Sequence, residues 1–252
     1  MTKIILDNSK QPSQKEADKL LKYYQNGQYH EAEELALSFT QEFPEYPLSW
    51  KILGAIFRQT DRLLEALNAH KNAVLLSPKD FLAQNNLGIA LKDSGALDEA
   101  ERCYRKAITL RSTSADTHNN LGVVLKQLGR FDEAEESYGQ AIAIEPMHLD
   151  ALMNRWQLLF EKGELEAALK DSDICNNSIS RPRSLATLYA LRRIDEIYYR
   201  FKVQPEEDKT NLDIAAFSAF ISHITQKDTL HNFCNNPFDY IYSSNISSHQ
   251  ED

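Results

Sequence analysis

Apolar and polar positions recur every 34 residues along this chain, most clearly in its middle. The segment Asn85-Asn86-Leu87-Gly88 returns as Asn119-Asn120-Leu121-Gly122, and Asp98-Glu99-Ala100-Glu101 returns as Asp132-Glu133-Ala134-Glu135. A fixed period of this length is typical of stacked helical hairpins, each burying its apolar side on its neighbours. The pattern therefore predicts an all-α fold, and such folds usually provide a binding surface.

The same period extends to both sides of these two copies. Subtracting 34 finds Trp50 and Leu53-Gly54, and adding 34 finds Leu159 and Gly163, with Arg155-Trp156 in place of Leu-Gly. We therefore predict five repeats, of which the outer ones are less regular, as expected for units that have one neighbour fewer. Their predicted ranges are 13–46, 47–80, 81–114, 115–148 and 149–182.

These residues resemble the pattern of the tetratricopeptide repeat family over roughly residues 13–182. That pattern runs from a Trp or similar residue through Leu-Gly, a large residue, Ala, an aromatic residue and Ala to Pro. The sequence departs from it in the outer Leu-Gly pairs and at three further positions: His70 and Ser172 replace aromatic residues, and Ser112 replaces a proline. The resemblance implies a right-handed α-solenoid of helix-turn-helix repeats.

Small residues mark the places where the two helices of a hairpin must approach each other. We expect Gly88 to lie against Ala100 and Gly122 against Ala134, with Tyr104 filling the space beyond. Glycine inside a helix costs up to about 1 kcal/mol relative to alanine, so its repeated use at one position indicates a packing requirement.

Outside the repeats we expect an N-terminal tail over residues 1–12 and C-terminal capping helices over 183–226. Apolar spacing predicts one helix from about 184 to 202, then a loop, then a helix capped by Asn211. Residues 227–252 form an aromatic and then polar tail. Because a solvated tail seldom carries so many aromatic residues, we expect it to dock on this body or on a following domain.

Composition narrows the function. The net charge of −9 argues against nucleic-acid binding, although residues 47–148 are nearly neutral, with 12 basic and 13 acidic side chains. No apolar run approaches the roughly 20 residues that a membrane span needs, and no signal peptide is evident, so a cytoplasmic location is the default. Three separated cysteines give neither a disulfide framework nor metal spacing.

Catalytic motifs are also missing from the sequence. We find no phosphate-binding loop and no nucleophile elbow. His148-Leu149-Asp150 has the His-x-Asp spacing of non-haem iron ligands, but it falls at a junction between hairpins and we interpret it as chance. We therefore predict no catalytic, cofactor or metal site.

Two rows of polar residues fall on the predicted first helices, which in this architecture line the concave wall. One row is asparagine, whose amide offers both a donor and an acceptor and can hold the backbone of an extended peptide. It resembles the asparagine ladder of O-linked N-acetylglucosamine transferases. The other row is basic and favours an acidic or carboxylate-ended ligand. The predicted partner-binding residues are Lys51, Arg58, Asn85, Asn86, Lys92, Asn119, Asn120, Lys126 and Asn154.

Both rows have a structural alternative. The asparagines could bond helix backbone and fix the stacking, and the basic row could be a solvated helix face. The carboxylate clamp that family members use to capture chaperone tails is a poor match. Its positions hold Lys51, Ala55, Asn86, Asp116 and Asn120 here, and Asp116 would repel a carboxylate.

Taken together, the sequence predicts a non-enzymatic protein-interaction scaffold that binds an extended peptide or a partner protein. Two alternatives remain open. In the first, the chain is the substrate-recruiting N-terminal part of a larger enzyme of the 2-oxoglutarate/iron oxygenase or glycosyltransferase type. Its tail resembles a connector that precedes such oxygenase domains in some bacterial repeat proteins. In the second, the solenoid assembles with copies of itself as a homo-oligomer.

Overall fold

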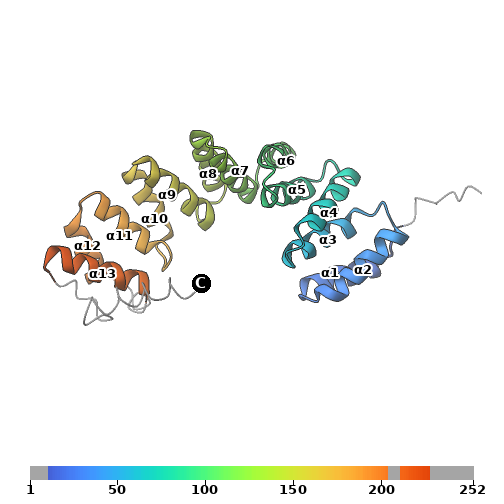
Figure 1. Ribbon diagram of the computed structural model, residues 1–252, viewed down its shortest axis with the longest axis horizontal. Helices are drawn as coiled ribbons and strands as arrows, with labels where there is room; N and C mark the ends of the chain where they lie inside the picture. Colours follow the sequence, from blue (N-terminus) through green and yellow to red (C-terminus); the bar gives the residue numbers. More distant parts are fainter. Residues whose placement is uncertain (1–10, 204–210, 228–252) are drawn as a thin grey trace, which may run out of the picture. The chain divides into compact units, whose positions relative to one another are not determined.

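The computed structural model describes residues 11–203 and 211–227, and within these ranges it contains thirteen α-helices and no strand (Figure 1). The predicted all-α class is therefore confirmed. The predicted tails, 1–12 apart from its last two residues and 227–252 apart from Lys227, lie outside the described residues. The helices are α1 Gln14–Gln25, α2 Tyr29–Glu42, α3 Pro47–Gln59, α4 Leu63–Leu76, α5 Phe81–Asp93, α6 Leu97–Leu110, α7 Ala115–Gln127, α8 Phe131–Ile144, α9 Leu149–Lys162, α10 Leu165–Cys175, α11 Arg181–Ala190, α12 Ile194–Lys202 and α13 Leu212–Thr225.

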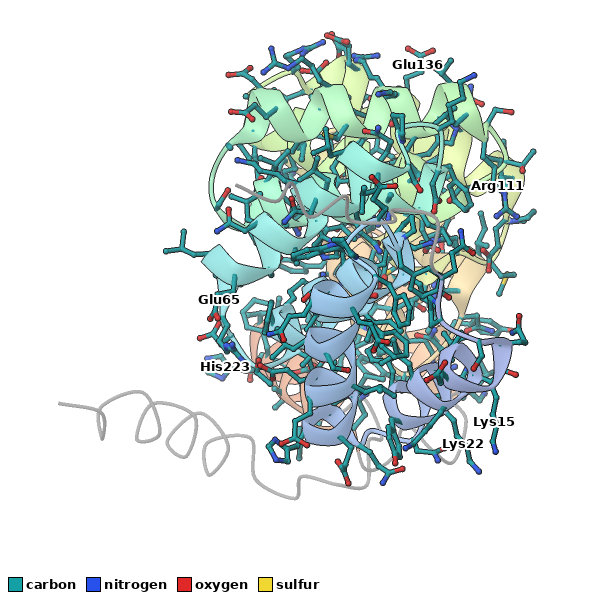
Figure 2. All side chains as sticks on the ribbon, turned by 90° about the vertical axis from the view of Figure 1, so that its right-hand side faces the viewer. Lys15, Lys22, Glu65, Arg111, Glu136 and His223 are labelled. Carbon is teal, nitrogen blue, oxygen red and sulfur yellow. The ribbon has the colours of Figure 1, made fainter. Side chains whose placement is uncertain are left out.

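The chain divides into two compact units, residues 1–144 with α1–α8 and residues 145–252 with α9–α13. In the first unit every helix packs on the next one in the chain, and α5 also contacts α7. Helices therefore pair into hairpins, and we call α1, α3, α5 and α7 the first helices and α2, α4, α6 and α8 the second helices. Charged side chains project outward, as Lys15, Lys22 and Glu65 do (Figure 2).

The turn inside each hairpin needs a residue in the left-handed region of backbone space. Glycine adopts this conformation without steric cost and is found at four of these turns, whereas a non-glycine residue adopts it at the other two. The residues with positive φ at these turns are Gly27, Asp61, Gly95, Gly129, Gly163 and Arg192.

The last of these turns corrects a prediction. The stretch 184–202 is not one helix, because Arg192 at φ 59° interrupts it and separates α11 from α12. With α13 these helices share a buried cluster that includes Leu188, Ile197 and Ile221, and the cluster also takes in Leu169 of α10. As predicted, Asn211 caps the last helix, where its side chain accepts hydrogen bonds from the N–H groups of Asp213 and Ile214.

The glycines of the first helices lie against an aromatic ring of the paired second helix. A Cβ atom built on Gly88 would lie 2.7 Å from Cε1 of Tyr104, and one on Gly122 would lie 2.6 Å from the Tyr138 ring. Gly54 faces the His70 ring in the same way. A side chain added at these glycines would thus meet the aromatic ring first. The expected approach of Gly88 to Ala100 and of Gly122 to Ala134 stays a prediction.

Ion pairs lie at every junction between hairpins of the first unit, and the first and third junctions use residues at equivalent repeat positions. Arg62 at the start of α4 contacts Glu33 of α2 at 2.6 Å, and Arg130 at the start of α8 contacts Glu101 of α6 at the same distance. Between them, Lys51 of α3 contacts the N-cap residue of α5, Asp80, at 2.9 Å. These exposed or half-exposed pairs favour one stacking register more than they add stability.

None of the helices in the described ranges combines the length and the hydrophobicity that crossing a lipid bilayer would require.

Candidate functional site

Two of the predicted asparagines are buried. Asn85 and Asn119 are only 9% and 7% exposed. The Nδ2 of Asn120 on α7 donates to the Oδ1 of Asn85 on α5 over 3.5 Å, a distance at the outer limit of a hydrogen bond. This contact joins two successive first helices, which agrees with the stacking interpretation for Asn85.

The neighbouring asparagine behaves differently. Asn86 is half-buried on α5, and its side chain makes no hydrogen bond with any other described residue. Its amide therefore keeps its full capacity as a donor and an acceptor toward a ligand. Asn120, also half-buried, makes only the long bond to Asn85 just described.

The basic row divides into residues with different surroundings. Lys92 of this row contacts its neighbour Asp93 at 3.2 Å, whereas Lys51, which the sequence predicted as a partner-binding residue outside the row, pairs with Asp80. Arg58 is exposed and Lys126 is half-buried. Lys51 thus holds a hairpin junction, and its use for a ligand would have to disrupt that junction.

Asp80 is a structural residue that the sequence did not reveal. Its carboxylate accepts from the N–H groups of Leu82 and Ala83 at the start of α5 and also from Lys51. Burial opposes its ionisation, but the hydrogen bond and charge of Lys51 and the two N–H groups together hold the pKa of Asp80 below its usual value. The ionised carboxylate therefore caps one helix and binds the hairpin before it.

Asn154 is described with the second unit, where it lines a cleft of about 650 Å³ between α9 and α11. The cleft also reaches Asp213, at the start of α13. Its other walls are Met153, Trp156, Gln157, Phe160, Glu161, Ile179, Pro182, Arg183 and Ala186. Its size is that of a typical small-ligand or side-chain pocket.

The aromatic wall of this cleft is held in place from behind. Trp156 Nε1 donates to the hydroxyl of Thr187 over 3.0 Å, and this hydroxyl donates to the carbonyl of Arg183 over 2.7 Å. The guanidinium of Arg183 lies 5.4 Å from the centre of the Trp156 ring. The centre of the Phe160 ring lies 5.4 Å from the centre of the same Trp156 ring. We did not predict this group of residues, although the replacement of Leu-Gly by Arg155-Trp156 was a signal of it.

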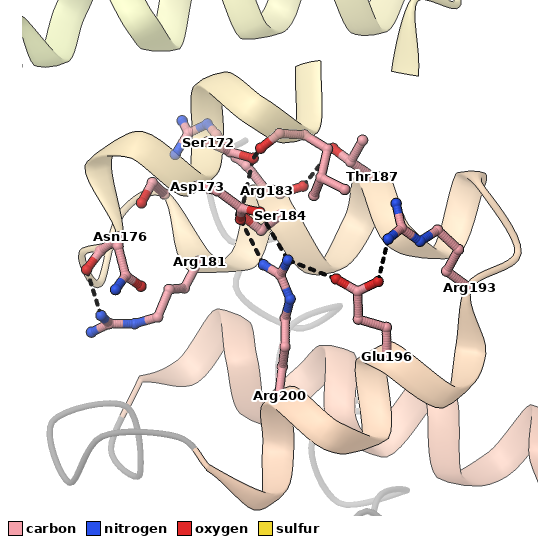
Figure 3. A network of polar contacts seen from close by, with 12 residues as sticks. Ser172, Asp173, Asn176, Arg181, Arg183, Ser184, Thr187, Arg193, Glu196 and Arg200 are labelled. Atoms are coloured by element: carbon pink, nitrogen blue, oxygen red, sulfur yellow. Dashed lines mark hydrogen bonds and ion pairs between the residues drawn. The ribbon is translucent and has the colours of Figure 1, made fainter. Parts of the chain in front are cut away.

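A network of polar contacts connects α10, α11 and α12 (Figure 3). Asp173 of α10 accepts two hydrogen bonds from Arg200 of α12, at 2.6 and 2.8 Å, and one from Ser184 of α11 at 2.6 Å. Burial opposes ionisation of Asp173, but Arg200 and Ser184 together keep its pKa low. One carboxylate thus ties α10, α11 and α12 together, and α11 forms one wall of the cleft.

The described residues offer little for catalysis. Among them, no group of His, Cys, Asp and Glu side chains is arranged to hold a metal ion. His148 caps α9, where its Nδ1 accepts from the N–H of Ala151 over 3.2 Å. Burial raises the pKa of the Cys103 and Cys175 thiols, so neither is activated as a thiolate.

Comparison with solved structures places the fold. PilF of Pseudomonas aeruginosa superposes with a TM-score of 0.66 at 17% identity, covering 81% of this chain and 96% of its own. A tetratricopeptide repeat protein from Parabacteroides merdae gives 0.63 at 13% identity, covering 94% and 93%. In the Cut9–Hcn1 hetero-tetramer of the APC/C the score is 0.63 at 14% identity, covering 92% of this chain and 46% of that one.

Comparison of sequences leads to the same fold. None of the curated proteins matches this chain. Two sequence models of the tetratricopeptide repeat do match it, one over residues 80–145 and the other over residues 18–75 and 119–172. Together with the helical hairpins and their glycine–aromatic contacts, these matches show that the chain belongs to the tetratricopeptide repeat family.

Proposed function

We propose that this chain is a protein-interaction scaffold in which the first helices α3, α5 and α7 bind an extended, acidic peptide of a partner protein. Tetratricopeptide repeats support a protein-interaction role in general. The observation that carries the finer proposal is Asn86, a half-buried amide that makes no hydrogen bond with any other described residue. An amide in this state is suited to pair with a peptide group of a ligand, whatever the ligand's side chains.

The charges on the same helices set the preference of the surface. Lys92 and Lys126 each follow an asparagine of the row by six residues, and exposed Arg58 occupies the corresponding place on α3. Such cations raise the association rate of an acidic peptide more than they raise its affinity. A dissociation constant in the micromolar range, about −8 kcal/mol, is expected for a peptide held in this way.

The chain needs no catalytic activity of its own for this role, and it would act in the cytoplasm. The Cut9–Hcn1 hetero-tetramer is an example of a protein assembly that contains a chain of similar fold.

The test uses an array of extended peptides of varied net charge, probed with the full chain. We expect acidic peptides to be selected. The double variant Asn86→Ala/Asn120→Ala should lower the affinity for these peptides about fivefold to tenfold, which corresponds to the loss of about one hydrogen bond. The matched control is Asn68→Ala, because Asn68 is an exposed asparagine on the second helix α4. Equal affinities of the double variant and the control, with unchanged circular dichroism, would remove the asparagine row from the site.

A second comparison tests the basic row. Lys92→Ala/Lys126→Ala should lower the association rate and flatten its dependence on salt. Lys71→Ala/Lys106→Ala serves as the control, since it removes two exposed lysines of second helices and the same net charge. If both double variants slow binding equally, only net charge matters and the proposed surface is wrong.

A further inference from the structure

We propose that residues 233–242 of this chain bind in the cleft between α9 and α11, as an intramolecular occupant. This inference stands apart from the proposed peptide surface of the first unit, because it rests on the second unit alone. The segment reads Phe-Cys-Asn-Asn-Pro-Phe-Asp-Tyr-Ile-Tyr and contains four aromatic residues.

The walls of the cleft match this composition. Trp156, Phe160, Met153 and Pro182 present apolar surface, and Ile179 beside them is 51% exposed. Because Thr187 already fixes the Trp156 ring, little side-chain freedom is lost when a ligand packs on it. A cleft of about 650 Å³ has room for a few large side chains.

The lining of the cleft carries charges of both signs, the cation Arg183 and the carboxylates Glu161 and Asp213. Asp239 is the one ionisable carboxylate of the segment 233–242. The Arg183 guanidinium lies over the Trp156 ring and also donates to the carbonyl of Ile179 over 2.6 Å. In the proposed complex Asp239 pairs with Arg183, and the aromatic contacts and this pair together outweigh repulsion from Glu161 and Asp213.

The chain is long enough to reach the cleft from the end of the described part. Asp213 at the start of α13 lines the cleft, and the remaining turns of α13 up to Thr225 extend about 18 Å. Tyr198 of α12 donates to the carbonyl of Lys227 over 3.0 Å and so fixes the point of departure. Six further residues span up to about 20 Å, which is enough to return Phe233 to the cleft.

A short connection also favours the chain's own segment over that of a second copy. A segment tethered through a short linker has an effective concentration in the millimolar range, well above the concentration of free chains. Even a weak contact would therefore be occupied within one molecule before two molecules compete for it.

Trp156 provides a direct readout, because the chain contains only two tryptophans and the other, Trp50, is in the first unit. In a Trp50→Phe background, Phe238→Ser/Tyr240→Ser should at least double the quenching of Trp156 fluorescence by acrylamide. The control Tyr199→Ser removes a tyrosine that is 65% exposed on α12 and should leave quenching unchanged. If Trp50→Phe unfolds the chain, the fluorescence of the Trp156→Phe variant is subtracted from that of the parent at each acrylamide concentration. The difference is the fluorescence of Trp156 alone.

The remaining outcomes decide between occupants. A synthetic peptide of residues 230–244, added to the double variant, should restore protection in a saturable way. If the double variant and its parent are quenched alike, or if the peptide has no effect, the proposal is overturned. Protection that rises with protein concentration would assign the cleft to a segment of another copy and would overturn the intramolecular proposal as well.

Discussion

The Cα of Gly88 on α5 lies against the ring of Tyr104 on α6, so closely that a methyl group added to the glycine would come within 2.7 Å of the ring. The Tyr104 side chain is fully buried, and burial raises the pKa of its hydroxyl above the ordinary value. This contact, repeated at Gly122 and Tyr138, sets the separation of the two helices in a hairpin. The family's preference for glycine here therefore has a steric cause.

The first prediction concerns this contact. Gly88→Ala should destabilise the chain by about 1–3 kcal/mol, since overpacking at the buried ring outweighs the better helix propensity of alanine. Urea denaturation measures the effect. In a Tyr104→Leu background the same change should cost less, because the ring it meets is gone. Equal costs in both backgrounds would contradict the steric explanation.

The second prediction follows from His70, which occupies the ring position opposite Gly54. Burial, with a smaller contribution from the charge of Arg58, lowers the pKa of His70 to about 4 from its ordinary value of 6.5. The unfolded chain therefore binds this proton more readily than the folded chain. Stability is full above pH 6.5 and falls as the pH drops toward 4, by about 3 kcal/mol in all.

Replacing His70 by tyrosine, the residue found at the two following ring positions, should remove this loss. We expect the free energy of unfolding of His70→Tyr to change less than that of the parent between pH 7 and pH 4.5. His30→Asn is the control, because His30 is exposed and its removal should leave the parent's pH dependence intact. A parent-like pH profile in His70→Tyr would show that another group is responsible.

The third prediction concerns the buried ion pair of the second unit. Arg155 donates to both oxygens of Asp171, at 2.7 and 2.6 Å, and the Asp171 side chain is 1% exposed. Arg155→Leu leaves this carboxylate unpaired and should cost about 3–5 kcal/mol. The double variant Arg155→Leu/Asp171→Ser carries the residues found 34 positions earlier, Leu121 and Ser137, and should recover most of the loss in a thermal melt. A double variant less stable than Arg155→Leu would refute this account.

The fourth prediction tests the packing of the hairpin itself. Ala100 on α6 is fully buried, so Ala100→Arg would bring an unpaired charge and excess volume into the first unit. We expect a loss of several kcal/mol, measured by chemical denaturation. Glu99→Arg, at the neighbouring exposed position, should change stability little. An unaffected Ala100→Arg variant would show that our assignment of buried positions in this helix is wrong.

The fold could be predicted because its rule is local and repeated. A glycine at one position and a ring 16 residues later, as in Gly88 and Tyr104, are visible in the sequence as a period. The turn at Arg192 was missed because no glycine or proline marks it, and the apolar spacing of α11 and α12 runs on without a break. The division into five repeats at the boundaries given above stays a prediction, as do the partner-binding residues.

The site was harder to foresee, because its state depends on contacts between hairpins. The sequence indicates Lys51 as a candidate partner-binding residue, but only the stacking brings it to Asp80, a residue 29 positions away. Likewise, Trp156 read as a departure from the family pattern. Only the structure shows that Trp156 belongs to the wall of a cleft, where Thr187 and Arg183 of α11 contact it.

The ion pairs between hairpins of the first unit have a consequence for chain assembly. Hairpins as similar as the two that contain Asn-Asn-Leu-Gly are able to pack on the wrong neighbour during folding. The residue that precedes the second helix is Arg62 at α4, Ala96 at α6 and Arg130 at α8. Neighbouring hairpins therefore do not carry a cation for an ion pair at the same position. A hairpin displaced by one position would therefore lose its Arg–Glu ion pair, whereas the first and third junctions carry equivalent pairs.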